Sequence, residues 1–208
     1  MNGNGVLKIK ATGEDFAGSF ENGVLVHGQV ICKEGEYLGQ FAPDNTRAYQ
    51  GRGIMKFKSG DVYDGQWYNG LMHGHGTFIY AKIFESDSED EEEGEGKKPT
   101  ITANYVGEFT YGKRASGTLT YDNGDVYTGI FSESGLRETG SIKLANGDEF
   151  CGVFEEGAMK CGEMTCKNGD VYNGEYANSM YHGGGKMVYA NGDVYSGEFE
   201  FGGKNGSG

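Results

Sequence analysis

The sequence has little proline, no long apolar run and no excess of positive charge. Only 2 of its 208 residues are proline, which argues against a proline-rich linker. No stretch approaches the roughly 20 consecutive apolar residues of a membrane-spanning helix. The N-terminal segment MNGNGVLKIK has no apolar core of the kind that signal peptides need. We therefore expect a cytoplasmic protein.

Charge and cysteine content narrow the classes of ligand. The formal net charge is −13, and nucleic acids and anionic membranes both attract basic surfaces, so we expect no nucleic-acid partner and disfavour a membrane partner. The four cysteines form no Cys-x-x-Cys pair, which argues against a zinc site. We expect no metal and no cofactor. Cys32 and Cys166 are predicted to be core thiols, and Cys151 the exposed one.

Glycines and aromatic residues are abundant instead. The chain has 39 glycines, 14 tyrosines and 12 phenylalanines, and this aromatic content argues against wholesale disorder. The pattern aromatic-x-Gly-x-aromatic occurs eight times, and five of the seven spacings between its copies lie between 21 and 23 residues. The copies are Phe16-Gly18-Phe20, Tyr37-Gly39-Phe41, Tyr63-Gly65-Trp67, Tyr105-Gly107-Phe109, Tyr127-Gly129-Phe131, Phe150-Gly152-Phe154, Tyr172-Gly174-Tyr176 and Tyr195-Gly197-Phe199. A fixed period of this length indicates a repeat architecture.

Each repeat is predicted to be a pair of antiparallel strands. Residues two apart share one face of a strand, so the motif aligns two rings and a glycine, whose missing side chain leaves space for a neighbouring ring. A second alternating segment follows each motif, and Asn-Gly-Asp closes it at 123–125, 146–148, 168–170 and 191–193. Asn-Gly is a strong hairpin signal because both residues tolerate positive φ.

The fold class expected from these features is all-β, an elongated, twisted single antiparallel sheet of about eight two-stranded repeats. We expect one domain over residues 1–208, with a half repeat at 3–10. Repeats are predicted to begin near residues 16, 37, 63, 105, 127, 150, 172 and 195.

The motifs resemble the MORN repeat, whose pattern is roughly Tyr-x-Gly-x-aromatic, a turn, His-Gly-x-Gly, a strand and Asn-Gly. The best matches are Tyr63 to Gly76 and Tyr172 to Gly185. The second copy departs from the pattern over Ala42–Tyr49, and the fourth to sixth lack His-Gly. Three of the four histidines, His27, His73 and His182, fall near the His-Gly position, so a structural turn role is expected rather than catalysis.

An acidic insertion interrupts the period at residues 85–98, which hold eight acidic residues and two lysines. The flanking segments still alternate, so we expect a lengthened hairpin with this segment as its tip. Ser86 and Ser88 each precede an acidic residue by three positions, as acidophilic-kinase sites do. A solvated loop and a docking element for basic surfaces are both open interpretations of the segment.

Two surfaces are predicted to bind partners. A single-layer sheet cannot cover both of its faces, so the aromatic face is expected to form a groove for another protein. Its residues would be Tyr63, Trp67, Tyr105, Phe109, Tyr127, Phe131, Tyr172 and Tyr176. The C-terminal edge strand would pair with another copy or a related protein, through Tyr195, Gly197, Phe199 and Phe201.

The function expected from these features is that of a non-enzymatic scaffold that binds other proteins. Resemblance to repeat-only MORN proteins implies a cytoskeletal or ciliary role, as in radial spoke heads of the flagellar axoneme, and homo- or heterodimers through terminal repeats. The alternative is a MORN adaptor that links a membrane or a lipid kinase to the cytoskeleton. An enzyme with MORN repeats as a targeting region would need a catalytic domain, for which the chain leaves no room.

Overall fold

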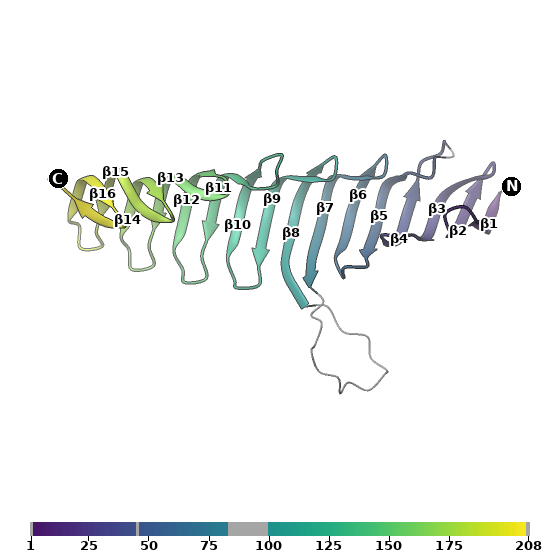
Figure 1. The fold of residues 1–208 in the computed structure, drawn as a ribbon, viewed down its shortest axis with the longest axis horizontal. Helices are drawn as coiled ribbons and strands as arrows, with labels where there is room; N and C mark the ends of the chain where they lie inside the picture. Colours follow the sequence, from purple (N-terminus) through teal and green to yellow (C-terminus); the bar gives the residue numbers. More distant parts are fainter. Residues whose placement is uncertain (1, 45, 83–99, 207–208) are drawn as a thin grey trace, which may run out of the picture. The chain divides into compact units, whose positions relative to one another are not determined.

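The computed structural model describes residues 2–44, 46–82 and 100–206, and every helix or strand among them is a β-strand. In this described part, no helix is long and apolar enough to cross a membrane. The chain divides into two compact units, Met1–Lys113 and Arg114–Gly208. All strand pairs within each unit are antiparallel, which confirms the predicted all-β antiparallel class (Figure 1).

The first unit is a meander in which each strand pairs with the next one along the chain. Its strands are β1 (Gly3–Ile9), β2 (Glu14–Glu21), β3 (Val24–Ile31), β4 (Gly35–Phe41), β5 (Tyr49–Phe57), β6 (Val62–Tyr68), β7 (Leu71–Lys82) and β8 (Thr100–Thr110). Strand β1 supplies the half repeat. Strands β7 and β8 remain paired as far as Lys82 and Thr100. The acidic segment 85–98, with Ser86 and Ser88, lies outside the described residues.

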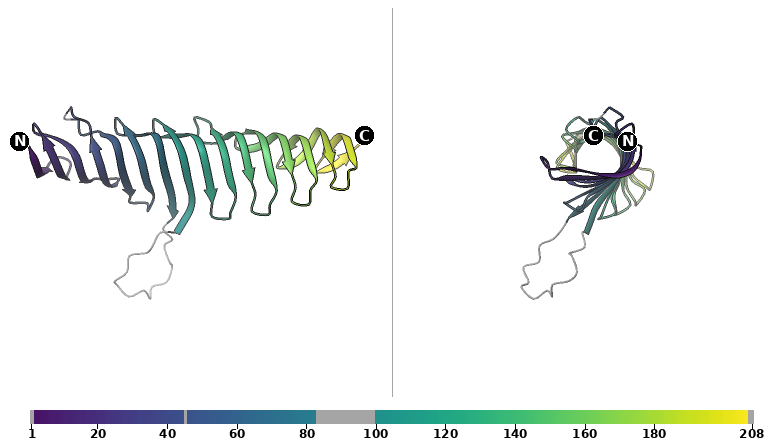
Figure 2. Two further views of the ribbon diagram at one scale, coloured as in Figure 1. Left: turned by 180° about the vertical axis from the view of Figure 1, so that it is seen from behind. Right: turned by 90° about the vertical axis from the view of Figure 1, so that its right-hand side faces the viewer.

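The second unit follows the same plan. Its strands are β9 (Lys113–Tyr121), β10 (Val126–Phe131), β11 (Arg137–Lys143), β12 (Glu149–Glu155), β13 (Ala158–Thr165), β14 (Val171–Ala177), β15 (Met180–Val188), β16 (Val194–Glu200) and β17 (Gly203–Asn205). Each again pairs with its neighbour in sequence. Figure 2 shows that the strands of each unit are twisted and curved rather than flat.

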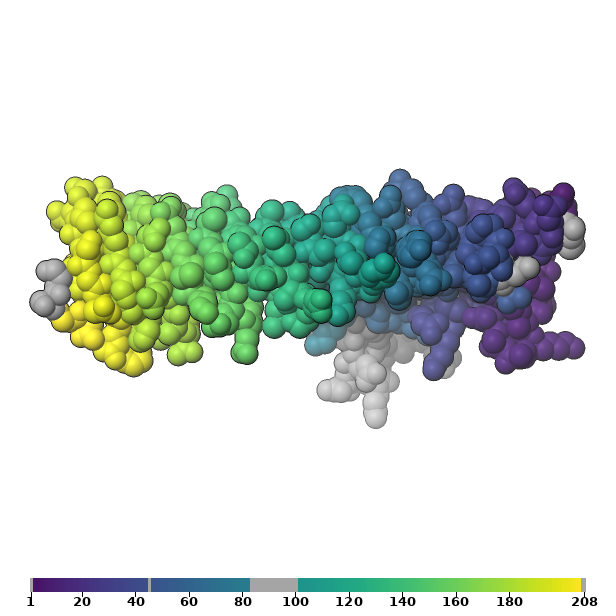
Figure 3. Space-filling model, turned by 90° about the horizontal axis from the view of Figure 1, so that it is seen from above, coloured from purple at the N-terminus to yellow at the C-terminus, as the bar shows by residue number. Residues whose placement is uncertain are grey.

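Two kinds of turn join the strands. Two-residue turns follow the first strand of most repeats, and both of their residues have positive φ, as at Asn22-Gly23 (50° and 86°) and Asn69-Gly70 (49° and 80°). Such type I′ turns match the right-handed twist of the strands they join. In the first unit these turns lie at the upper ends of the strands in Figure 1, and Figure 3 views the molecule from that side.

The Asn-Gly-Asp turns have a different geometry from the one predicted. In the loop after β9, only Gly124 has positive φ (92°), so the expectation of two such residues was wrong there. The Asn123 side chain instead accepts a hydrogen bond from the Asp125 amide at 3.0 Å and donates one to the Asp125 carboxylate at 2.9 Å. Asparagine is favoured because its side chain closes the turn.

The aspartate of these turns also connects each repeat to the next. Asp125 accepts a hydrogen bond from the Ala145 amide, Asp148 from the Lys167 amide and Asp170 from the Ala190 amide, each at 2.8 Å. In the first unit, Asp61 accepts one from the Ala81 amide at 2.7 Å. The Asn-Gly-Asp signal therefore encodes a contact between repeats as well as a turn.

A row of glycines crosses every strand of each unit except β17. In each pair of adjacent strands, the two glycines lie directly opposite one another. The row consists of Gly5, Gly18, Gly28, Gly39, Gly53, Gly65, Gly76 and Gly107 in the first unit, and Gly117, Gly129, Gly140, Gly152, Gly162, Gly174, Gly185 and Gly197 in the second.

Tyrosine rings cover much of this row. A Cβ atom added at Gly65 would lie 2.5 Å from the Cζ atom of Tyr63, and one at Gly76 would lie 2.5 Å from Cε2 of the same ring. Tyr172 covers Gly174 and Gly185 in the same way. The prediction that a neighbouring ring fills the space is thus confirmed at Gly65 and Gly174, where the ring is that of the residue two positions earlier, and the same ring covers the facing glycine of the next strand. Glycine is required because the ring lies flat against the backbone.

Candidate partner-binding site

The eight aromatic residues predicted to line a groove are buried. Their exposed fractions are 0 to 7 %, so the structure does not show them as an open aromatic surface. The residues are Tyr63, Trp67, Tyr105, Phe109, Tyr127, Phe131, Tyr172 and Tyr176. That a partner binds on this side of the sheet stays a prediction.

Neighbouring rings on the same face of the sheet bury one another. Within a repeat, the two rings meet edge to face, as Tyr63 and Trp67 do at a centroid distance of 5.1 Å. Between repeats, Tyr63 meets Phe109 at 5.0 Å and Phe150 meets Tyr176 at 5.2 Å. Such edge-to-face contacts contribute beyond the buried area. The twist of each sheet brings the rings close enough to form a continuous core.

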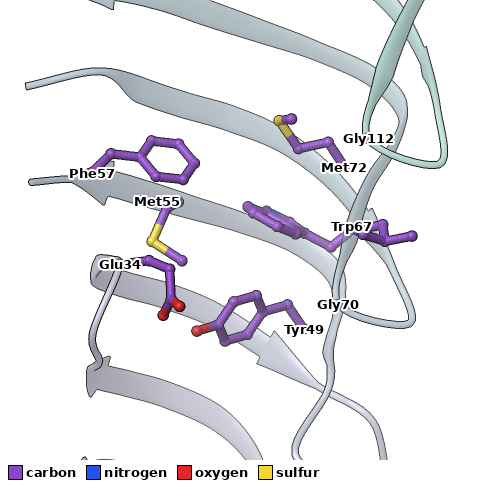
Figure 4. Close-up of a pocket in the computed structure, with 9 residues that line it drawn as sticks. Glu34, Tyr49, Met55, Phe57, Trp67, Gly70, Met72 and Gly112 are labelled. Atoms are coloured by element: carbon purple, nitrogen blue, oxygen red, sulfur yellow. The ribbon is translucent and has the colours of Figure 1, made fainter. Parts of the chain in front are cut away.

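An apolar pocket of about 290 Å³ opens beside this core in the first unit. It is lined by Glu34, Tyr49, Met55, Phe57, Trp67, Gly70, Leu71, Met72 and Gly112. Figure 4 shows the side chains of β5, β6 and β7 converging on it. Leu71, which is 46 % exposed, also contributes to the lining. Of the eight predicted groove residues, Trp67 is the one that lines this pocket.

The indole of Trp67 is fixed in orientation. Its Nε1 atom donates a hydrogen bond to the carbonyl oxygen of Gly53 at 3.0 Å. The ring also packs edge to face against Tyr37 at 5.4 Å and against Tyr49 at 5.2 Å. A ligand in the pocket would therefore meet a preformed aromatic wall, which lowers the entropy cost of binding.

Tyr49 forms another wall and comes from the segment that departs from the repeat pattern. Its ring stacks on Tyr37 with centroids 3.9 Å apart, and its hydroxyl donates a hydrogen bond to Sγ of Cys32 at 3.6 Å. Burial raises the pKa of Tyr49, and the contact with Cys32 and the carboxylate of Glu34 raise it further. The hydroxyl is therefore neutral and the wall uncharged at physiological pH.

The predicted C-terminal edge is partly covered. Residues 198–200 of β16, the strand expected to form this edge, pair with the short strand β17. Phe199 is buried, and Tyr195 lies beside it at a centroid distance of 5.2 Å. Phe201, in the turn, is 74 % exposed. Gly197 pairs with Gly185 on β15. Association through this edge stays a prediction.

The cysteines and histidines also have defined places. Cys32 is buried, Cys166 is half-buried and Cys151 is exposed, while Cys161, for which no exposure was predicted, is exposed as well. His27, His73 and His182, expected in turns, lie instead within β3, β7 and β15. In the described ranges, no group of three or more His, Cys, Asp or Glu residues is arranged to hold a metal ion.

Sequence reasoning missed Tyr49 and Glu34, because neither belongs to the repeated motif. The insertion over Ala42–Tyr49 was a usable signal, since a departure from a regular repeat often marks a function. Sequence reasoning also did not predict that the glycines of the second strands align with the motif glycines in one row. Their spacing of 10 to 14 residues after the motif glycine was visible in Gly28, Gly53 and Gly76.

Comparison with known families finds MORN repeats in this chain. The MORN repeat model matches residues 63–82, 105–126 and 172–194. These three segments contain both of the best-matching copies identified above, so the resemblance is confirmed there. They correspond to strands β6–β7, to most of β8 with β9, and to β14–β15, and the second and third segments also include the turn that follows.

Two further comparisons cover larger parts of the chain. Alsin from Rattus norvegicus and alsin from Homo sapiens are each 25 % identical over 141 residues, which cover 63 % of this chain and 7 % of alsin. The chain thus spans a small part of the length of these relatives. The TCP domain of SAS-4 from Drosophila melanogaster, solved with a proline-rich motif of Ana2, has a TM-score of 0.43 and 12 % identity over 93 % of this chain and 88 % of that one.

Proposed function

We propose that the whole chain is a MORN-repeat scaffold that binds another protein and catalyses no reaction. The observation that carries this proposal is the preformed apolar pocket between Tyr49 and Trp67. Interfaces concentrate their binding energy in such aromatic pockets. Its volume of about 290 Å³ lies at the lower limit of small-molecule sites, which span about 300–1,000 Å³. That size suits the side chain of a partner better than a cofactor.

The cellular setting we propose is the cytoskeleton, as a ciliary or flagellar axonemal component such as a subunit of a radial spoke head. The MORN repeats and their resemblance to repeat-only members of that family support this assignment. Partners would be cytoskeletal or axonemal proteins, including a related MORN protein that pairs with β16.

The alternative is an adaptor that links a membrane or a lipid kinase to the cytoskeleton. The net charge of −13 opposes it, because anionic membranes attract basic segments. Sedimentation with vesicles containing phosphatidylserine separates the two functions. The scaffold should stay in the supernatant at physiological salt, whereas saturable, salt-sensitive binding would favour the adaptor.

Site-specific photocrosslinking in cells tests the scaffold directly. A photoreactive phenylalanine analogue at Leu71, an exposed residue of the pocket lining, should crosslink to a defined partner. The same analogue at Ile31 is the matched control, because Ile31 is 61 % exposed on β3 and its neighbour Val30 is buried on the opposite face. Crosslinks to the same proteins from both positions, or from neither, would overturn the proposed function of the pocket.

A further inference from the structure

We propose that the pocket binds the side chain of an arginine carried by an extended segment of a partner protein. This inference rests on the proposed function and names the chemistry that the scaffold recognises. It is argued from the position of Glu34, from the rings around it and from the charges nearby.

Glu34 supplies a carboxylate at an otherwise apolar site. Its side chain is exposed and lines the pocket together with Met55 and Phe57. Figure 4 shows its carboxylate beside the hydroxyl end of Tyr49. Among the described residues, no lysine, arginine or histidine forms an ion pair with Glu34. A carboxylate held at the mouth of an apolar pocket and lacking a cation is complementary to a cationic ligand.

The pocket walls favour arginine over lysine. The rings of Tyr49, Phe57 and Trp67 line it, and a guanidinium group stacks on aromatic faces and is more weakly hydrated than an ammonium group. The fork of the guanidinium can also donate two hydrogen bonds to one carboxylate. The methylene stem of arginine would contact Met55 and Met72, as long basic side chains do on apolar surfaces.

The charges of the adjoining surface favour binding of one partner cation, beside Glu34. A second pocket of about 190 Å³ shares Tyr49 and Gly70 with the first and contains Glu14 and Arg47. Arg47 lies 5.9 Å from the ring centre of Phe16, so this neighbouring pocket already holds a guanidinium. A partner segment that crosses both pockets would thus place its arginine beside Glu34.

The second unit has similar rings, but the carboxylates that act on the Tyr181 hydroxyl, those of Asp148 and Asp170, already accept hydrogen bonds from the chain. Tyr181 stacks on Tyr172 at 4.0 Å and its hydroxyl lies 3.4 Å from Sγ of Cys166, as Tyr49 does with Tyr37 and Cys32. In the turn after Cys166, however, Asn168 stands where Glu34 follows Cys32 by two positions, and its amide donates to Asp170 at 2.8 Å. Arginine binding is therefore a property of the first unit.

Trp67 is the only tryptophan of the chain, so its fluorescence reports on this pocket alone. The probes are three synthetic peptides, Ac-(Ala-Arg)₃-NH₂, Ac-(Ala-Lys)₃-NH₂ and Ac-(Ala-Gln)₃-NH₂, titrated into the full chain. The arginine peptide should change the fluorescence saturably, with a dissociation constant at least five-fold lower than that of the lysine peptide. The glutamine peptide should leave the signal unchanged. Equal responses to arginine and lysine would show only general attraction to an acidic protein, and would overturn the inference.

Two variants of equal charge complete the test. Glu34→Gln should weaken binding of the arginine peptide at least ten-fold, while Glu21→Gln, at an exposed site outside the pocket, should change it less than two-fold. Both residues are exposed, so both variants should fold, which circular dichroism checks. Equal losses in both variants, or none, would overturn the role of Glu34. If the peptides fail but Leu71 still crosslinks to a partner, only the arginine assignment is wrong. Peptide binding without a crosslinked partner would instead contradict the scaffold.

Discussion

The hydroxyl of Tyr63 donates a hydrogen bond to the carbonyl oxygen of Gln66, three residues later on the same strand, at 2.7 Å. The ring reaches over Gly65 to make this bond. The carbonyl is available because the pairing of β6 with β7 shifts register between Gly65 and Trp67. Tyr37 makes the same bond at 2.8 Å beside a register shift after Gly39, so one contact joins the motif tyrosine, the glycine and the bulge there, and Tyr105 bonds the Glu108 carbonyl at 2.8 Å.

Replacing Tyr63 by phenylalanine should destabilise the protein by about 0.5–1.5 kcal/mol, because the hydrogen bond to the Gln66 carbonyl is lost. Tyr176→Phe is the matched control. The Tyr176 hydroxyl is buried and has no hydrogen-bond partner among the described residues, so its removal should be neutral or slightly stabilising. Urea unfolding of the full chain measures both changes. Equal losses of stability would show that the bond to Gln66 contributes nothing of its own.

We expect alanine substitutions at two glycines on adjacent strands to differ strongly in their effect on stability. Gly174→Ala would place a Cβ atom 2.4 Å from the Tyr172 hydroxyl and 2.8 Å from the Gly184 carbonyl oxygen. Overpacking of this kind costs about 1–3 kcal/mol. At Gly184, an added Cβ atom would meet nothing within 4 Å, so Gly184→Ala should stay within about 0.5 kcal/mol of the parent protein. Thermal unfolding compares the two, and similar melting temperatures would contradict a packing role for Gly174.

The contact between repeats can be tested one amide at a time. Asp148→Ala removes the acceptor for the Lys167 amide, so this amide should exchange its hydrogen faster by a factor that corresponds to about 1 kcal/mol. Asp193→Ala is the control, because Asp193 makes the same turn contacts with Asn191 but accepts no amide from a later repeat in the described part of the chain. Lys167 exchange that is unchanged in Asp148→Ala would rule out the contact as a stabilising one.

Stability should fall steeply in alkaline solution. Burial, the largest cause, raises the pKa of Tyr37, Tyr63 and Tyr176 above the ordinary tyrosine value. Because these groups hold their protons more tightly in the folded state, their contribution is complete below about pH 10 and is lost as pH rises toward the folded-state pKa values. The free energy of unfolding in urea, measured between about pH 9 and 11, should therefore decrease. Tyrosines that all ionise near pH 10 while the chain stays folded would contradict this.

The repeated features were predictable from the sequence because their causes are local. Alternation in segments such as Tyr63-Asp-Gly-Gln-Trp67 fixes a strand and its inner face. Asn22-Gly23 and Asn69-Gly70 fix type I′ turns, since few other residues adopt positive φ at both positions. These features recur with a near-constant period, and the predicted antiparallel meander follows from them.

Whether the aromatic side chains are buried or exposed depended on the tertiary structure. Spacing placed Trp67 and Phe109 on one face but could not say whether that face was open. The twist of the sheet brings Tyr63 within 5.0 Å of Phe109 and buries both rings. Curvature accumulates over many strand pairs, so no single motif specifies it.

The sequence by itself determined the repeat, the all-β class and the positions of most turns, since each follows from the conformational preferences of a few adjacent residues. Only the tertiary structure decided which glycines face each other, which amide each turn aspartate reaches, and that Glu34, Tyr49 and Trp67 meet at one pocket. These residues are far apart along the chain and lie on different strands or loops. Their meeting depends on strand register and on the irregular segment before Tyr49, and long-range geometry of this kind leaves no local pattern.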